Sequence, residues 1–149
     1  MKGFLPKFAE LRVGWNEKAL FEADFYRICK KLKISVQVMP MANRGYYSTS
    51  KGKHFIAIKE GMPELQMLFV MFHEFGHYLM HAPGGLGEAR FSGKPKDTRE
   101  EREADAFAFC ALLPLELLSN LTPQELVDVE GYPAWFLMRR LAVYERYGI

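Results

Sequence analysis

The sequence contains few cysteines, and this scarcity excludes two kinds of architecture. Only Cys29 and Cys110 occur among the 149 residues, and they are too far apart to form a Cys-x-x-Cys pair. A disulfide framework or a thiolate zinc site is therefore not expected. Reduced cysteines favour a cytoplasmic protein.

Long apolar runs and a strong net charge are also absent. The longest apolar stretches, 65–72 and 106–115, are too short to cross a bilayer. The first residues carry scattered charges and no apolar run before a small-residue cleavage site, so a secretory signal is not expected. The formal charge is only +2, which argues against binding driven by phosphate contacts. We expect no membrane partner and no direct DNA binding.

The residues that are present predict one α+β domain over 1–149. About half of them are hydrophobic, which is enough for a core. Apolar residues at helical spacing predict an amphipathic helix over 16–33. The alternating pattern of 34–40 predicts a strand, and 44–50 and 54–60 predict two more strands joined by a turn at Lys51 and Gly52. We expect these strands to form a small three-stranded antiparallel sheet.

Two longer helices follow the strands. The segment ELQMLFVMFHEFGHYLMH at 64–81 is apolar on most faces, as in a helix at the centre of a domain. Thr98 and Glu101 form a capping-box pattern at the start of the second helix, which runs to Pro114. The Gly-rich stretch 83–97 between them predicts a loop, either a lid or a plain surface connection.

The sequence HEFGH at 73–77 predicts a metal site. His73 and His77 lie one helical turn apart, so their imidazoles can converge on one ion. Glu74 lies about 100° round the helix, where its carboxylate can reach a water bound to that ion. Zinc lowers the pKa of such a water from about 16 to about 7, and the carboxylate can carry its proton to a leaving amine. The pattern is typical of metal-assisted amide hydrolysis.

His81 shares the helix face of these histidines but is not expected to bind the same ion. It lies two turns, about 12 Å, from His73 if the helix is regular. We expect a neighbour of the site or a helix-end residue.

The third ligand is expected from the acidic segment REEREAD at 99–105. Glu101 and Asp105 are one turn apart, so both can face the HEFGH helix. Glu101 can bind the metal while Asp105 accepts a hydrogen bond from a ligating histidine. Glu100 and Glu103 compete for the ligand role, but Glu100 lacks an acidic partner one turn on and Glu103 points to another side. Alternatively, the segment is only the negative first turn of a helix, with Glu101 occupied in the cap.

The two motifs HEFGHYLMH and EREADAFAFCALLP together resemble the ImmA/IrrE family of metallopeptidases, a branch of the gluzincins. The resemblance extends upstream through GYYSTSKGKHFIAIKEG and covers residues 16–115. It implies a gluzincin-like active-site helix and one zinc ion per chain. The implied roles are metal ligation by His73, His77 and Glu101, general base and acid for Glu74, and a supporting position behind the ligands for Asp105.

The resemblance also implies a partner. Proteins of this family typically cleave or control a helix-turn-helix repressor encoded beside them. We therefore expect a zinc-dependent endopeptidase that acts on such a repressor. The alternative is a non-hydrolytic regulatory or toxin-like partner of a DNA-binding protein, which keeps the fold but has no need of Glu74.

The C-terminal residues 121–149 resemble a helix-turn-helix, with Arg139 and Arg140 on the second helix. The neighbouring WFLM at 135–138 leaves few polar positions free, so packing or recognition of a repressor is favoured over reading DNA.

Two further features could contribute to substrate binding or catalysis. The strand 53–60 is either an edge that pairs with a peptide or a central strand. Residues that could stabilise an oxyanion by their type are Tyr46, Tyr47, His54, Tyr78 and His81.

Overall fold

The computed structural model describes residues 3, 5–81, 88–91 and 97–149. Contacts divide the chain into two compact units, residues 21–108 and residues 1–20 with 109–149. Helices and one sheet are both present, which confirms the α+β class. The prediction of a single domain over the whole chain stays a prediction.

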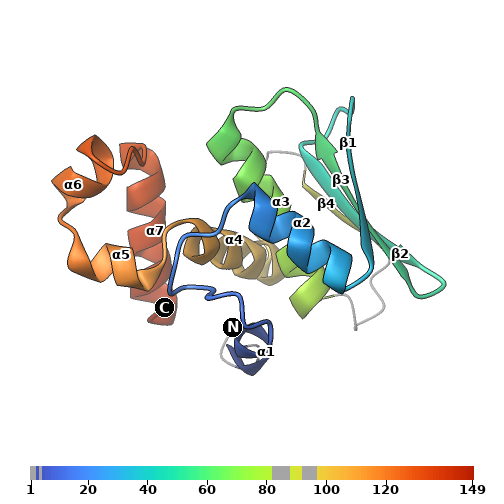
Figure 1. Ribbon diagram of the computed structural model, residues 1–149, viewed down its shortest axis with the longest axis horizontal. Helices are drawn as coiled ribbons and strands as arrows, with labels where there is room; N and C mark the ends of the chain where they lie inside the picture. The colour runs from blue at the N-terminus through green and yellow to red at the C-terminus, as the bar shows by residue number, and fades with distance from the viewer. Residues whose placement is uncertain (1–2, 4, 82–87, 92–96) are drawn as a thin grey trace. The chain divides into compact units, whose positions relative to one another are not determined.

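The unit 21–108 contains a mixed sheet. Its elements are α2 (Glu22–Lys31), β1 (Ile34–Met39), β2 (Gly45–Ser50), β3 (Lys53–Lys59), α3 (Glu64–Met80), β4 (Glu88–Phe91) and the first turns of α4 (Arg99–Leu112) (Figure 1). The strand order is β1-β3-β2-β4. β2 is antiparallel to β3 and β4, but β1 is parallel to β3. The expectation of a three-stranded antiparallel sheet is therefore wrong in the direction of β1, and the backbone of β4 extends the sheet.

β1 and β3 are parallel because the chain crosses the end of β3 before it enters β2. The amide of Lys59 donates to the carbonyl of Arg44 (2.9 Å), and the amide of Glu60 donates to the carbonyl of Met39 (3.0 Å). β3 is consequently a central strand that pairs on both sides, so the interpretation of 53–60 as an edge is wrong.

β4 lies within the stretch that the sequence predicted to be a loop. Four residues of that stretch, Glu88–Phe91, pair with β2. The rest of the predicted loop, apart from Asp97, lies outside the described residues, and so does the question of a lid.

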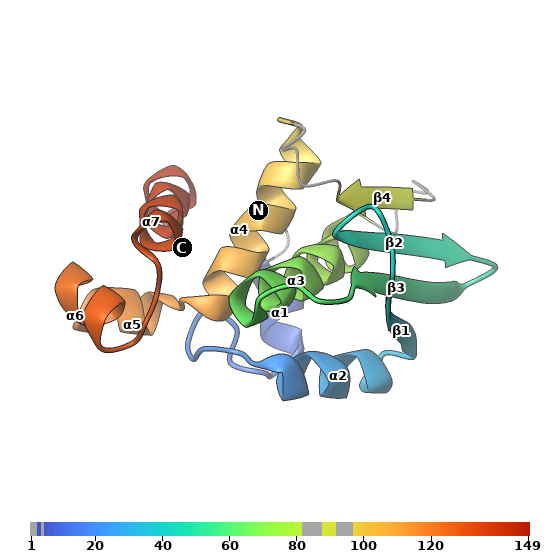
Figure 2. The same ribbon diagram turned by 90° about the horizontal axis from the view of Figure 1, so that it is seen from above.

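α3 occupies the predicted position and packs against β2 and β3, while α2 packs against β1 on the same face of the sheet (Figure 1). Phe72 of α3 and Phe25 of α2 are fully buried, with ring centroids 5.8 Å apart. α3 also lies between the sheet and the first turns of α4 (Figure 2). The residues of HEFGH are therefore held on a helix covered on several sides.

α2 begins later than the predicted helix over 16–33. Asn16 adopts a left-handed backbone conformation (φ 62°), and its side-chain oxygen accepts a hydrogen bond from the amide of Leu115 (2.9 Å). The helix begins at Glu22, where the amide of Phe21 donates to the carboxylate of Asp24 (2.8 Å). A tertiary hydrogen bond thus replaces the first turns that periodicity suggested.

The second unit contains α1 (Leu5–Glu10), the end of α4, α5 (Leu115–Asn120), α6 (Pro123–Asp128) and α7 (Ala134–Tyr147). α6 begins after its N-cap residue Thr122, and α7 begins after Pro133. No helix among the described residues is long and apolar enough to span a bilayer.

Arg140 of α7 is fully buried and holds three segments of this unit together. Its Nε donates to the carbonyl of Leu113 (2.6 Å), its Nη1 to the carbonyl of Ile149 (2.7 Å) and its Nη2 to Oδ1 of Asn16 (3.0 Å). A buried guanidinium is tolerated only when its donors are satisfied in this way. Arg140 is therefore a structural residue rather than one exposed for contact with a partner.

Candidate metal centre

The site forms where α3 and α4 approach closely at Gly76. A Cβ atom at this position would lie 3.3 Å from Cα of Ala104 and 3.4 Å from Cβ of Phe107, which is tighter than or at the limit of ordinary contact. The small residues Gly76 and Ala104 therefore allow the two helices to pack with little between them. This packing brings the acidic first turn of α4 beside the histidines of α3.

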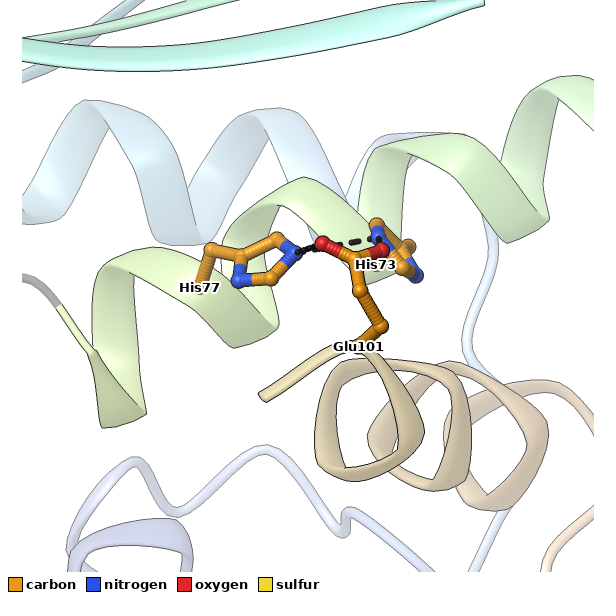
Figure 3. Close-up of side chains that lie close together, drawn as sticks. All are labelled: His73, His77 and Glu101. Carbon is orange, nitrogen blue, oxygen red and sulfur yellow. Dashed lines mark hydrogen bonds and ion pairs between the residues drawn. The ribbon is translucent and has the colours of Figure 1, made fainter. Parts of the chain in front are cut away.

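His73, His77 and Glu101 point toward one another (Figure 3). The Nε2 atoms of the two histidines are 3.1 Å apart, and each lies 3.3 Å from a different oxygen of Glu101. The three ligand atoms lie within 4.8 Å of one another. Two ligands bound to zinc at 2.0–2.1 Å in tetrahedral geometry are about 3.3 Å apart. The spacing therefore fits three ligands of one ion.

Asp105 supports the first histidine from behind. Its Oδ1 lies 2.7 Å from Nδ1 of His73, the ring nitrogen that faces away from the triad. A carboxylate at this place accepts the Nδ1–H proton, which leaves the lone pair of Nε2 directed at the triad. The structure thus places Glu101 and Asp105, one turn apart on α4, around the same histidine.

Glu101 serves the helix start and the triad with different atoms. Its amide donates to Oγ1 of Thr98 (3.2 Å), while its carboxylate faces both histidines. Burial alone would raise the pKa of Glu101, but the hydrogen bonds from His73 and His77 outweigh burial and lower it to about 2. The carboxylate is therefore ionised, and helix capping does not compete with a role at the site.

The pKa values of the two histidines are shifted in opposite directions. Burial lowers the pKa of His77. Burial also disfavours charge on His73, but the adjacent carboxylates of Asp105 and Glu101 outweigh it and raise its pKa to about 9. The carboxylates of Asp105 and Glu101 therefore favour a positive charge on His73, and the same carboxylates would favour a bound cation.

Glu74 is fully buried, and neither of its carboxyl oxygens has a hydrogen-bond partner in the described structure. Burial, with the nearby charge of Glu101, raises its pKa to about 8, although His73 acts in the opposite direction. A buried carboxyl without partners costs stability, and a catalytic role is one explanation for such a group. A group that exchanges its proton near neutral pH is suited to general acid–base catalysis.

Glu100 and Glu103, the other acidic candidates, are not part of the triad. Glu100 is exposed, whereas Glu103 is buried and contacts His81 rather than the triad. The hydroxyl of Tyr47 and Nδ1 of His54 share a hydrogen bond of 2.8 Å, and the ring of Tyr78 packs edge-on against His54 (4.8 Å). These groups bond to one another, and nothing in their contacts assigns them to an oxyanion.

Sequence reasoning did not anticipate the contacts of two residues near the site. Gly45 of β2 lies against Glu74, since a Cβ there would come within 2.9 Å of its Oε1. Glu103 connects with His77 through His81. For the contact with Glu103, the available signal in the sequence was His81, which follows His77 by one helical turn. For Gly45 there was no signal, because sequence periodicity does not show which side chain of another element a glycine contacts.

The chain matches the family model described as the IrrE N-terminal-like domain, of the M78 peptidases, over residues 29–146. No curated protein sequence matches it. The matched range contains the triad, Glu74 and Asp105. The resemblance of the two motifs covered residues 16–115, and the match continues past residue 115 toward the C-terminus. The chain therefore belongs to the IrrE N-terminal-like domain family of the M78 peptidases.

Proposed function

We propose that this protein is a zinc-dependent endopeptidase that hydrolyses a peptide bond in a protein partner. The observation that carries the proposal is the convergence of His73, His77 and Glu101 beside the buried, unpartnered carboxyl of Glu74. Membership of a metallopeptidase family supports it. The two free, buried thiols are consistent with a reducing compartment, the cytoplasm.

Two imidazole nitrogens and one carboxylate form a ligand set typical of catalytic zinc, with one further position left for water or substrate. Zinc held by these three residues would supply the Lewis acidity that polarises a carbonyl and activates water. His73 is kept in the tautomer suited to binding by its hydrogen bond with Asp105. Glu74 takes a proton from the attacking water and gives it to the leaving amine.

We further propose that the substrate is a helix-turn-helix transcriptional repressor encoded beside this protein. The support is the family relationship and the resemblance of its two motifs to the ImmA/IrrE peptidases. The site chemistry itself requires only an amide bond. The partner is therefore the part of the proposal that most needs an experiment.

The test incubates purified, zinc-loaded protein with that repressor and follows cleavage by mass spectrometry. Glu74→Gln keeps the size of the side chain and removes the base, so we expect cleavage to fall by at least two orders of magnitude. Zinc content, measured by plasma mass spectrometry, should stay at one ion per chain. Glu100→Gln, an exposed glutamate on the same helix as Glu101, is the matched control and should cleave like the wild type.

Each outcome selects one function. Discrete fragments that disappear with Glu74→Gln support the peptidase and locate the scissile bond. Binding of the repressor by both proteins without fragments would favour the non-hydrolytic alternative. Protein that takes up no metal would contradict the metal site itself.

A further inference from the structure

A continuous series of hydrogen-bonded side chains leads from His77 away from the triad. Nδ1 of His77 lies 2.9 Å from Nδ1 of His81, and Nε2 of His81 lies 3.3 Å from Oε2 of Glu103. Nε of Arg99 donates to Oε1 of Glu103 (2.9 Å). His77 of α3, the helix-end residue His81, and Glu103 and Arg99 of α4 thus form one path that begins at a proposed ligand.

Metal binding determines where the protons of this path lie. When Nε2 of His77 binds a metal, the ring is neutral and its only proton is on Nδ1. Nδ1 of His81 must then accept that proton, so the proton of His81 is on Nε2 and points to Glu103. Every donor in the series then meets an acceptor, without a conflict at any position.

The hydrogen bonds of His81 and Glu103 are largely shielded from water. The side chain of His81 is 12% exposed and that of Glu103 is 5% exposed, so water competes little for these hydrogen bonds. Arg99 is 75% exposed and contacts Glu103 from the solvent side, where its charge offsets the buried carboxylate. The geometry at His77 is the counterpart of that at His73, which bonds directly with Asp105.

We infer that His81 is a positioning residue for the metal site, which orients His77 and selects its metal-binding tautomer while Glu103 in turn orients His81. The inference rests on the proposed metal site and extends it. The acidic helix α4 would then serve both histidines: Asp105 supports His73 directly, and Glu103 supports His77 through one intervening ring. His81 itself binds no metal in this arrangement.

Variants of His81 separate the two bonds that it makes. Asparagine places an amide oxygen near the position of Nδ1 and keeps an acceptor for His77, whereas glutamine places its amide near Nε2 and keeps a donor for Glu103. The zinc dissociation constant is measured by competition with a chromophoric chelator. We expect His81→Ala and His81→Gln to bind zinc about ten- to a hundredfold more weakly, and His81→Asn to lose less.

A matched control separates positioning from simple loss of stability. His54→Asn removes the histidine that lies on β3 and contacts Tyr47 and Tyr78 instead of the triad, so zinc affinity should be unchanged even if the protein melts at a lower temperature. Glu103→Gln gives a second, milder test because it leaves His81 in place. It should weaken zinc binding by less than His81→Ala.

A direct readout is the tautomer of each ring in the zinc-loaded protein, from proton–nitrogen correlation spectra of the imidazoles. The inference requires an Nδ1–H ring at His77 and an Nε2–H ring at His81. The opposite tautomer at His81, or unchanged zinc affinity in all three His81 variants, overturns it while the peptidase proposal stands. Wild-type protein that binds no zinc overturns both.

Discussion

At the scale of single residues, neighbours on one helix serve different partners. Glu101 faces the triad, Asp105 contacts His73, and Glu103 contacts His81. Helical spacing predicted that Glu101 and Asp105 share a face. It also predicted that Glu103 points to another side of the helix, but the pattern gives no information on the contact of Glu103 with His81. That depends on where α3 ends beside α4.

A prediction at this scale concerns Tyr132 and pH. Its hydroxyl donates to the carbonyl of Leu112 (2.6 Å), and burial raises its pKa to about 12. The folded state therefore keeps a proton that the unfolded state loses near pH 10, so the stability contributed by this group is full below pH 10 and is lost as pH rises toward 12.

Tyr132→Phe tests this by urea unfolding between pH 7 and pH 11. At pH 7 we expect the variant to be about 1 kcal/mol less stable, because one hydrogen bond is lost. Above pH 10 the difference should shrink by up to about 1.4 kcal/mol per pH unit. A difference that stays constant with pH would contradict the assignment.

At the scale of elements, glycines set how closely the helix of the site approaches its neighbours. Because Gly76 has no side chain, α4 can pack closely against α3. Because Gly45 of β2 has none, there is room for the side chains of Val70 and Glu74. The strands β1, β2 and β3 appear where the sequence predicted them, but a strand pattern contains no information about direction or about which strand is the neighbour. The crossing over the end of β3 is therefore visible only in the structure.

Gly45→Ala tests the contact between β2 and α3. The added Cβ would lie 2.4 Å from Cγ1 of Val70 and 2.9 Å from Oε1 of Glu74, so one of the two elements must shift. We expect a loss of about 1–3 kcal/mol in the free energy of unfolding. Because Glu74 also moves, cleavage of the substrate should fall more than zinc binding.

A second substitution provides the control for that experiment. Val70→Ala alone removes buried atoms and destabilises, but in combination with Gly45→Ala it removes the closest contact. We expect the double variant to be more stable than the sum of the single effects predicts, measured in a double-mutant cycle. If the two changes in the free energy of unfolding are strictly additive, the methyl group added at Gly45 is not crowded by Val70.

At the scale of the whole molecule, α4 is the element that contributes to both compact units. Its residues up to Ala108 belong to one unit, and its last residues belong to the other. Because a helix forms cooperatively, we expect the units to unfold together. The two buried thiols, whose pKa values burial raises to about 12, provide one probe in each unit.

Thiol labelling with a chromogenic disulfide reagent tests the prediction of a single domain. Cys29 reports on residues 21–108 and Cys110 on the other unit. In the variants Cys29→Ala and Cys110→Ala, the remaining thiol should be unreactive in the native state and should become reactive at the same urea concentration, after correction for each variant's stability. Two separate midpoints would show two independently folding units.

The sequence by itself determined the local features of this protein. The spacing of HEFGH placed two histidines on one face of α3, the acidic segment after Thr98 began α4, and both motifs led to the family. These follow from helical period and side-chain chemistry, which act over a few residues. Only the tertiary structure decided the parallel pairing of β1, the position of Gly45 against Glu74, and the path from His77 to Glu103. Each of these depends on the packing of segments distant in sequence, and that packing has no local signal.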